Sequence, residues 1–450
     1  MQNIHGFDYF PINFDEHGKG TNPSEMAALQ QRAATATDAI FFAHGFRNNE
    51  QDATTLYSNF LQSFRAHLAR PEFAALAARN YVIAGTYWPS KQFPESFGTV
   101  EGAVQSVDEE PTVPPALTEK LDNLKAAMPE HAAELTQAAA LLPQLNTDVA
   151  AQDRFAALVM ATLSGSQLDS TEGIQLLKGK AGSDIFEQLK GAVLVPQSPD
   201  SGGADGGSIS DTVGDFDSGG SGSAQSVSSV FGSILGGVDK FLNLTTWYVM
   251  KNRAGVVGEQ GVAKAVRDLK ASAANLRIHL VGHSLGGRMM AACSKALAQA
   301  PQLRPESVTL LEAAFSHFGF SPNNGFGKAG YFRDVMEKKG VKGPLLATYS
   351  AQDMAVGTDF AVTSRLNGNT TSAIGDENDP YGGIGRNGAL KTPESAVMVL
   401  KNISVAPLTP YIFQTGLVTC LNGSGGLIKN HGDVTNPNVT YAFTCSLNQT

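Results

Sequence analysis

The sequence predicts an α/β fold with a doubly wound, mostly parallel sheet and helices on both faces. Short apolar runs end in sharp turns at 38–46 (DAIFFAHGF) and 81–90 (YVIAGTYWPS). The interval between them has helical spacing, which makes a βαβ unit. The alternation then resumes far along the chain, between residues 277 and 402. These three observations place most of the chain in one parallel sheet.

The later elements follow in order. Strands are predicted at 277–281, 307–313, 344–350 and 396–402, with helices at 286–299 and near 330–339. We therefore expect a core built from residues 1–90 and 246–450.

An insertion at 91–245 interrupts this core. Its first part is rich in Ala and Leu with helical period, so it predicts a helical cap or lid. The tract 197–226 is rich in Gly, Ser and Asp and predicts a flexible linker; without a nine-residue repeat, calcium binding is the weaker interpretation. The apolar segment 227–255 fits either a helix packed on the core or a lid helix that touches a lipid interface transiently.

Composition excludes several classes of partner. The 450 residues carry 33 Lys and Arg against 42 Asp and Glu, a net charge of -9, which disfavours nucleic acids and anionic membranes. No run reaches the roughly 18 apolar residues of a membrane span. The first residues lack a signal-peptide pattern, so we expect a cytoplasmic protein, with leaderless export still open.

The three cysteines form neither a disulfide framework nor a zinc-ligand pattern. Cys293 is predicted to be a buried thiol. Cys420 and Cys445 could pair in an oxidising compartment, but free thiols are the favoured interpretation. We expect neither a metal nor an organic cofactor.

A nucleophile is predicted at Ser284, within the stretch GHSLG. A serine at the apex of a strand-to-helix turn exposes its hydroxyl above the sheet. Gly282 and Gly286, two positions either side, avoid Cβ clashes in this cramped turn, and Gly287 adds clearance. The following helix N-terminus favours developing negative charge.

Such a serine needs a base and an orienting acid. In enzymes with this turn, the chain order is serine, acid, histidine. Asp353 follows the strand at 344–350, which leaves His431 as the only histidine further along the chain. Asp353 could instead cap its own turn, and the acid could then be one of three other carboxylates: Glu312, Asp376 or Asp433.

The oxyanion of an acyl-transfer intermediate requires two donors. The backbone N–H of Leu285 is one, and that of Phe46 in AHGF is predicted to be the other. His44 and His283 flank these donors on the substrate side. Their simpler roles are to organise the loop by hydrogen bonds and to pack within the turn.

In these residues the chain resembles the lipase and esterase branch of the α/β-hydrolase superfamily. The motifs that carry the resemblance lie at 44–49, 88–90, 282–286, 350–357 and 431–433, and a glycine cluster at 381–389 resembles the family as well. The resemblance implies that Tyr87 and Trp88 line the acyl or alcohol pocket, although strand-end aromatics as often only pack.

The function expected is therefore a serine carboxylic-ester hydrolase (lipase or esterase) that acts on acyl or lipid-like esters through Ser284, His431 and Asp353. A phospholipase or lipase toxin delivered to other cells is the alternative. A non-catalytic binding protein with this fold is less favoured, because the set of site residues is complete. The sequence leaves acyl length and oligomeric state open.

Overall fold

A nine-stranded sheet forms the centre of the described structure. The computed structural model describes residues 2–46, 48–90, 113–163, 174–177, 179–190, 234–325, 327–356, 366 and 377–450. Its strands are β1 (Gln2–Ile4), β2 (Phe7–Asn13), β3 (Asp38–Ala43), β4 (Tyr81–Tyr87), β5 (Arg277–His283), β6 (Ser307–Leu311), β7 (Leu345–Tyr349), β8 (Ser395–Val399) and β9 (Val418–Asn422). They lie in the order β1-β2-β4-β3-β5-β6-β7-β9-β8, and all neighbours are parallel except β1 and β2. The predicted α/β class and mostly parallel sheet are confirmed.

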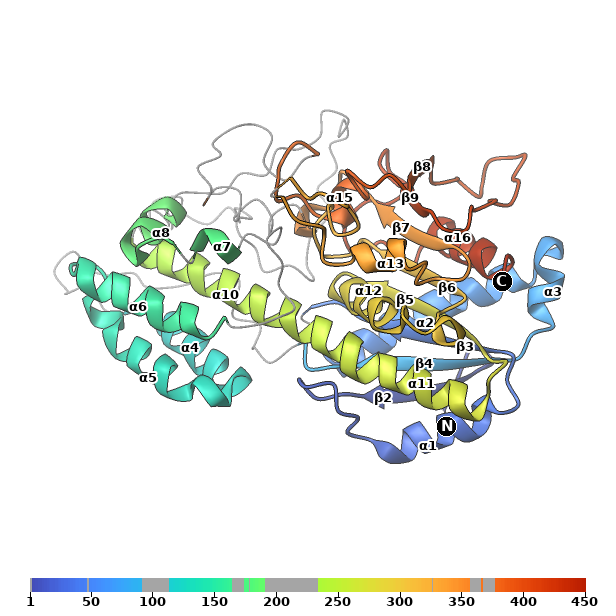
Figure 1. The fold of residues 1–450 in the computed structure, drawn as a ribbon, viewed down its shortest axis with the longest axis horizontal. Helices are drawn as coiled ribbons and strands as arrows, with labels where there is room; N and C mark the ends of the chain where they lie inside the picture. Colours follow the sequence, from blue (N-terminus) through green and yellow to red (C-terminus); the bar gives the residue numbers. More distant parts are fainter. Residues whose placement is uncertain are drawn as a thin grey trace.

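Helices cover both faces of this sheet (Figure 1). On one face lie α1 (Pro23–Ala33), α10 (Ile234–Val256), α11 (Ala263–Ser272), α12 (Leu285–Leu297) and α13 (Arg333–Glu337). On the other lie α2 (Glu50–Leu68), α3 (Ala74–Ala77) and α16 (Pro437–Leu447). We call the helices on these two faces the first and the second layer. Along β3, Phe41 packs against the first layer and its neighbour Phe42 against the second. Two buried faces explain why these strands read as continuous apolar runs rather than as alternating ones.

A group of helices extends from one end of the sheet (Figure 1). It contains α4 (Pro115–Ala127), α5 (Ala132–Leu141), α6 (Val149–Ala161), α7 (Ile174–Leu177) and α8 (Gly182–Leu189), where the sequence predicts a helical insertion. The linker predicted at 197–226 lies outside the described residues.

Helix α10 joins this group to the sheet, packing against α8 and α4 near its start and against α12 further on. The boundary predicted at residue 245 therefore falls inside one continuous helix. Every residue of α10 is buried or half-buried, as in a helix packed on the core. Among the helices of the described residues, none combines the length and apolar character needed to cross a bilayer.

All three cysteines are buried free thiols, as the sequence favours. Cys420 faces the first layer and Cys445 the second, so the sheet separates them.

Candidate active site

The turn at Ser284 and the loop after β3 lie where the direction of strand winding reverses. From β3 the chain runs outward to β4, and after the insertion it returns to β5 on the other side of β3. In open α/β sheets such a switch point leaves a crevice at the carboxyl ends of the strands. Ala43 pairs with Gly282 in the last register position of β3 and β5, so the loop after Ala43 and the turn at Ser284 emerge side by side.

Ser284 occupies a strained turn between β5 and α12. Its φ of 58° and ψ of −123° are unusual for a residue with a side chain and cost about 1–3 kcal/mol. The predicted need for glycine on both sides is confirmed. A Cβ at Gly282 would lie 2.2 Å from the carbonyl oxygen of Gly286, and a Cβ at Gly286 would lie 2.2 Å from that of Ala43. At Gly287 a Cβ would meet that of Ala313 at 2.5 Å.

The structure brings the predicted acid and base together although 78 positions separate them in the chain. His431 Nδ1 donates a hydrogen bond of 2.9 Å to Asp353 Oδ2. The carboxylate is fully buried, and its Oδ1 accepts from the N–H of Val356 at 2.9 Å. Because an ionised carboxylate only accepts, this bond fixes the proton on Nδ1 and leaves Nε2 as the basic nitrogen.

His283 holds the loop that carries His431. Its Nε2–H donates to the carbonyl oxygen of His431 at 2.8 Å, and the two imidazole rings lie 4.7 Å apart. Burial, and next the neighbouring His431, lower the pKa of His283 to about 3. The ring therefore stays neutral at physiological pH. These contacts make His283 a support for His431, and its predicted role on the substrate side remains a prediction.

The glycine cluster at 381–389 supports the turn at Asp353. It contains the short helix α15 (Ile384–Asn387), whose Arg386 donates to the carbonyl oxygens of Ala351 and Asp353 at 2.7 and 3.2 Å. Gly385 lies directly on the backbone of Glu312, where a Cβ would come within 2.5 Å. The absence of a side chain at Gly385 thus allows this segment to pack closely against the strand ends. Arg386 can then hold the turn at Asp353. The sequence marked the cluster only through the family resemblance.

The loop after β3 lies against Ser284. A Cβ at Gly45 would lie 2.7 Å from Ser284 Cβ and 3.2 Å from its Oγ. The predicted donors Phe46 and Leu285 directly follow Gly45 and Ser284 in the chain. Their backbone N–H groups therefore belong to two segments that lie side by side. The ring of Phe46 in turn contacts Trp247 of α10, with centroids 5.9 Å apart.

Tyr57 of α2 anchors this loop, and no motif in the sequence indicates this role. Its hydroxyl accepts from the N–H of His44 at 2.9 Å and donates to the carbonyl oxygen of Thr86 at 2.7 Å. His44 is itself buried; its Nδ1–H donates to the carbonyl oxygen of Gly45 at 3.0 Å. Burial lowers the pKa of His44 to about 4, against the opposing hydrogen bond to Gly45. His44 thus organises the loop, as its simpler role predicted.

Tyr87 and Trp88 are also buried and bonded within the protein. The Tyr87 hydroxyl lies 2.6 Å from that of Tyr9 and 2.7 Å from Thr54 Oγ1. Trp88 Nε1 donates to the carbonyl oxygen of His44 at 3.1 Å, and its ring stacks on the imidazole. These contacts give both side chains a structural role beneath the loop, and the predicted pocket-lining role stays a prediction.

The other candidate acids take different positions. Asp433 caps its own loop by accepting from the N–H of Lys429 at 3.1 Å, and Asp376 lies outside the described residues. Glu312 is fully buried at the end of β6 and accepts from Thr348 Oγ1 at 3.0 Å. Of the described candidates, only Asp353 has a hydrogen bond to His431 in the structure.

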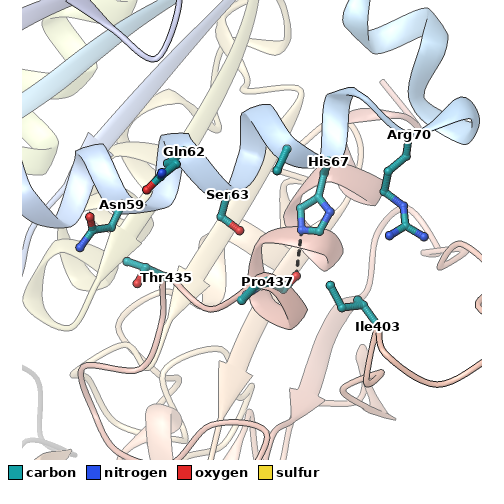
Figure 2. A pocket seen from close by; sticks show the side chains of 9 residues that line it. Asn59, Gln62, Ser63, His67, Arg70, Ile403, Thr435 and Pro437 are labelled. Atoms are coloured by element: carbon teal, nitrogen blue, oxygen red, sulfur yellow. Dashed lines mark hydrogen bonds between the residues drawn. The ribbon is translucent and has the colours of Figure 1, made fainter.

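Two cavities lie away from these residues. Figure 2 shows the larger, of about 490 Å³, between α2 and the start of α16. Two of its polar side chains are bonded to the protein: His67 Nε2 donates to the carbonyl oxygen of Pro437 at 2.9 Å, and Arg70 Nε donates to Glu72 at 2.7 Å. The second, of about 210 Å³, lies between the cap helices and α10. Neither is lined by Ser284, Asp353 or His431.

Comparison with protein-family models, with curated proteins and with solved structures found no match to this chain. Its function must therefore be argued from the geometry of the site.

Proposed function

We propose that this chain is a serine carboxylic-ester hydrolase of the α/β-hydrolase fold. The observation that carries the proposal is the 2.9 Å bond between His431 and Asp353, beside a strained serine turn at the switch point of the sheet. The strand order also supports it, because the serine, the acid and the histidine follow β5, β7 and β9 respectively. This is the chain order of such triads.

In the proposed reaction, His431 Nε2 takes the proton of Ser284 Oγ as the oxygen attacks the ester carbonyl carbon. The N–H groups of Phe46 and Leu285 stabilise the oxyanion, each donor being worth on the order of 3 kcal/mol. Imidazolium His431, stabilised by Asp353, returns the proton to the departing alkoxide. Water then attacks the acyl-enzyme by the same route and releases the acid.

The test is hydrolysis of p-nitrophenyl esters by Ser284→Ala. We expect the kcat to fall by about 10⁵-fold or more, while circular dichroism stays unchanged. Ser294→Ala is the matched control, since Ser294 is likewise buried but lies within α12 and donates its hydroxyl to the carbonyl of Met290. Retained turnover in Ser284→Ala would remove this serine from the mechanism.

Acyl or lipid-like esters are the substrate class we propose. The contact between Phe46 and Trp247 supports a link between the cap side and the oxyanion loop. A series of esters with increasing acyl length, measured below and above their solubility limits, would separate an esterase from a lipase. A jump in rate above the limit would mark interfacial activation.

A further inference from the structure

Side chains from two elements of the core hold the first two peptide groups of the loop after β3. The peptide that joins Ala43 to His44 donates its N–H to Tyr57 Oη at 2.9 Å. The next peptide, which joins His44 to Gly45, accepts at its carbonyl oxygen from Trp88 Nε1–H at 3.1 Å. Tyr57 lies in the middle of α2, and Trp88 directly follows β4. The backbone of His44 is therefore fixed at both its N–H and its C=O.

The third peptide group of this loop carries one of the proposed oxyanion donors. It joins Gly45 to Phe46, and its carbonyl oxygen accepts from His44 Nδ1–H at 3.0 Å. This peptide is trans, and the C=O and N–H of a planar trans peptide point in opposite directions. The bond to the carbonyl oxygen therefore also sets the direction of the Phe46 N–H. That direction depends on where the backbone and the ring of His44 are held.

The groups that hold His44 are buried. Tyr57 is fully buried, and its hydroxyl is fixed by a second bond, to the carbonyl oxygen of Thr86 at 2.7 Å. The ring of Trp88 is also buried and stacks on the imidazole of His44, with centroids 5.8 Å apart. A buried backbone group that loses its partner is left unsatisfied, at a cost in free energy. The loop is thus held in one arrangement by bonds that are costly to break.

We propose that Tyr57 and Trp88 are positioning residues for the Phe46 N–H, and that they keep the oxyanion hole formed before a substrate binds. This inference rests on the proposed function. Both side chains act through His44. A donor that is already directed at the site needs no reorganisation when negative charge develops in the transition state. Gly45 lies directly against Ser284, so a shift of the loop would also move the donor relative to the attacked carbonyl group.

Tyr57→Phe tests the proposal because it removes only the hydroxyl group. A displacement of about 1 Å near a reacting group costs about 100-fold in rate, so we expect kcat/KM for p-nitrophenyl esters to fall by about 10- to 100-fold. Circular dichroism should stay unchanged. Tyr81→Phe is the matched control: its buried hydroxyl also donates to a backbone carbonyl, that of Leu76 at 3.0 Å, but at the amino end of β4. This variant should keep the activity of wild type.

A trifluoromethyl ketone inhibitor separates a positioning role from a packing role. Ser284 Oγ adds to its carbonyl carbon, the hydroxyl proton passes to His431 Nε2, and the π electrons of the carbonyl group become an oxyanion in the proposed hole. The Ki should therefore rise in Tyr57→Phe by the same factor as kcat/KM falls. The corresponding methyl ketone adds poorly to a serine and reports binding before attack, so its Ki should change by less than about 2-fold.

Trp88→Phe is the second variant, and it carries the test if Tyr57→Phe does not fold. It removes the donor to the His44 carbonyl oxygen but leaves the Tyr57 hydroxyl in place. We expect the same pattern: a lower kcat/KM, a higher Ki for the trifluoromethyl ketone and an unchanged Ki for the methyl ketone. In the double variant the combined loss should be smaller than the product of the single losses, because both bonds hold the same residue.

Wild-type kcat/KM and Ki in a folded Tyr57→Phe would overturn the positioning role. A loss of activity with an unchanged Ki for the trifluoromethyl ketone would overturn it as well. The proposed ester hydrolase would stand in both cases, because its own test is Ser284-dependent turnover by wild type. If wild type lacks that turnover, the proposed function fails first and the positioning role fails with it.

Discussion

Buried polar groups are hydrogen-bonded to different extents at the two ends of the central strands. At the amino end, the fully buried Asp38 begins β3, and its carboxylate accepts from Arg277 Nε at 2.8 Å, from Arg79 Nη1 at 3.2 Å and from His279 Nε2 at 3.0 Å. Burial alone would raise the pKa of Asp38, but the bonds from His279 and Arg277 hold it well below its ordinary value. The charge at this end is fully compensated.

At the carboxyl end, the buried groups are left incomplete. His283 Nδ1 and Glu312 Oε2 have no hydrogen-bond partner among the described residues, and Ser284 and Glu312 adopt positive φ. The carboxylate of Asp38 shows that this sheet can satisfy a buried charge, so the unpaired atoms and positive φ angles at the other end are consistent with the proposed function there. In this account the amino end stabilises the fold, and the carboxyl end holds the strained backbone positions that the proposed chemistry would use.

The largest effect, on the free energy of unfolding, is expected at the amino end of the strands, where the charge of Asp38 is compensated. Asp38→Asn removes a buried anion from two guanidinium groups and the imidazole of His279, and should lower the free energy of unfolding by about 3 kcal/mol. Esterase activity per folded molecule should change little. Urea unfolding measures the loss, and Asp122→Asn, which breaks an exposed ion pair with Lys125, should cost under about 0.5 kcal/mol. A large loss of turnover in folded Asp38→Asn would contradict the assignment of stability to the amino end and activity to the carboxyl end.

The next largest effect, on turnover, is expected next to Ser284. Gly45→Ala places a methyl group 2.7 Å from Ser284 Cβ, so the serine or the loop must shift. Displacement of about 1 Å at a reacting group costs about 100-fold in rate, so kcat should fall by that factor. Gly20→Ala is the control, because the nearest atom to its Cβ would be 4.0 Å away. Normal turnover in Gly45→Ala would mean that this loop does not bound the site.

The smallest effect concerns pH. His283 is neutral when folded, with a pKa of about 3, but titrates near 6.5 when unfolded. Below pH 6.5 the unfolded chain binds the extra proton, so stability falls with pH, by about 2 kcal/mol at pH 5 from this group. Glu312, whose pKa is raised, has the opposite sign: the stability it contributes is present below its unfolded pKa and is lost as pH rises.

A difference measurement isolates the histidine. His283→Gln keeps an N–H donor for the His431 carbonyl but has no titrating group, and the contributions of other groups cancel between the two chains. Urea unfolding at pH 7 and pH 5 should therefore show a loss about 2 kcal/mol smaller in His283→Gln than in wild type. Equal losses would show that His283 is not held neutral.

The sequence predicted the elements whose local pattern agrees with their place in the fold. Continuous apolar runs predicted β3, β4 and β5, because both faces of a parallel strand are buried. It did not predict β1, β2 and β9. In β2 the run FDYFPIN contains an aspartate and a proline, which are typical of turns. This segment becomes a strand because it pairs with β4 and packs against α1.

Within the site, motif and chain order predicted Ser284, Asp353 and His431. They could not predict the supports, because these depend on side chains that meet only after folding. Tyr57 reaches His44 from the middle of α2, and Arg386 reaches the Asp353 turn from 33 positions away. Neither has a local signature. The unsatisfied oxygen of Glu312 is likewise a property of packing, invisible in the residue type alone.

The most direct test of the central claim, that His431 activates Ser284, is covalent labelling with a fluorophosphonate followed by peptide mass mapping. The account predicts a single adduct on the peptide that contains Ser284, formed far more slowly in His431→Ala. An adduct on another serine, or labelling of Ser284 at the same rate in His431→Ala, would contradict it.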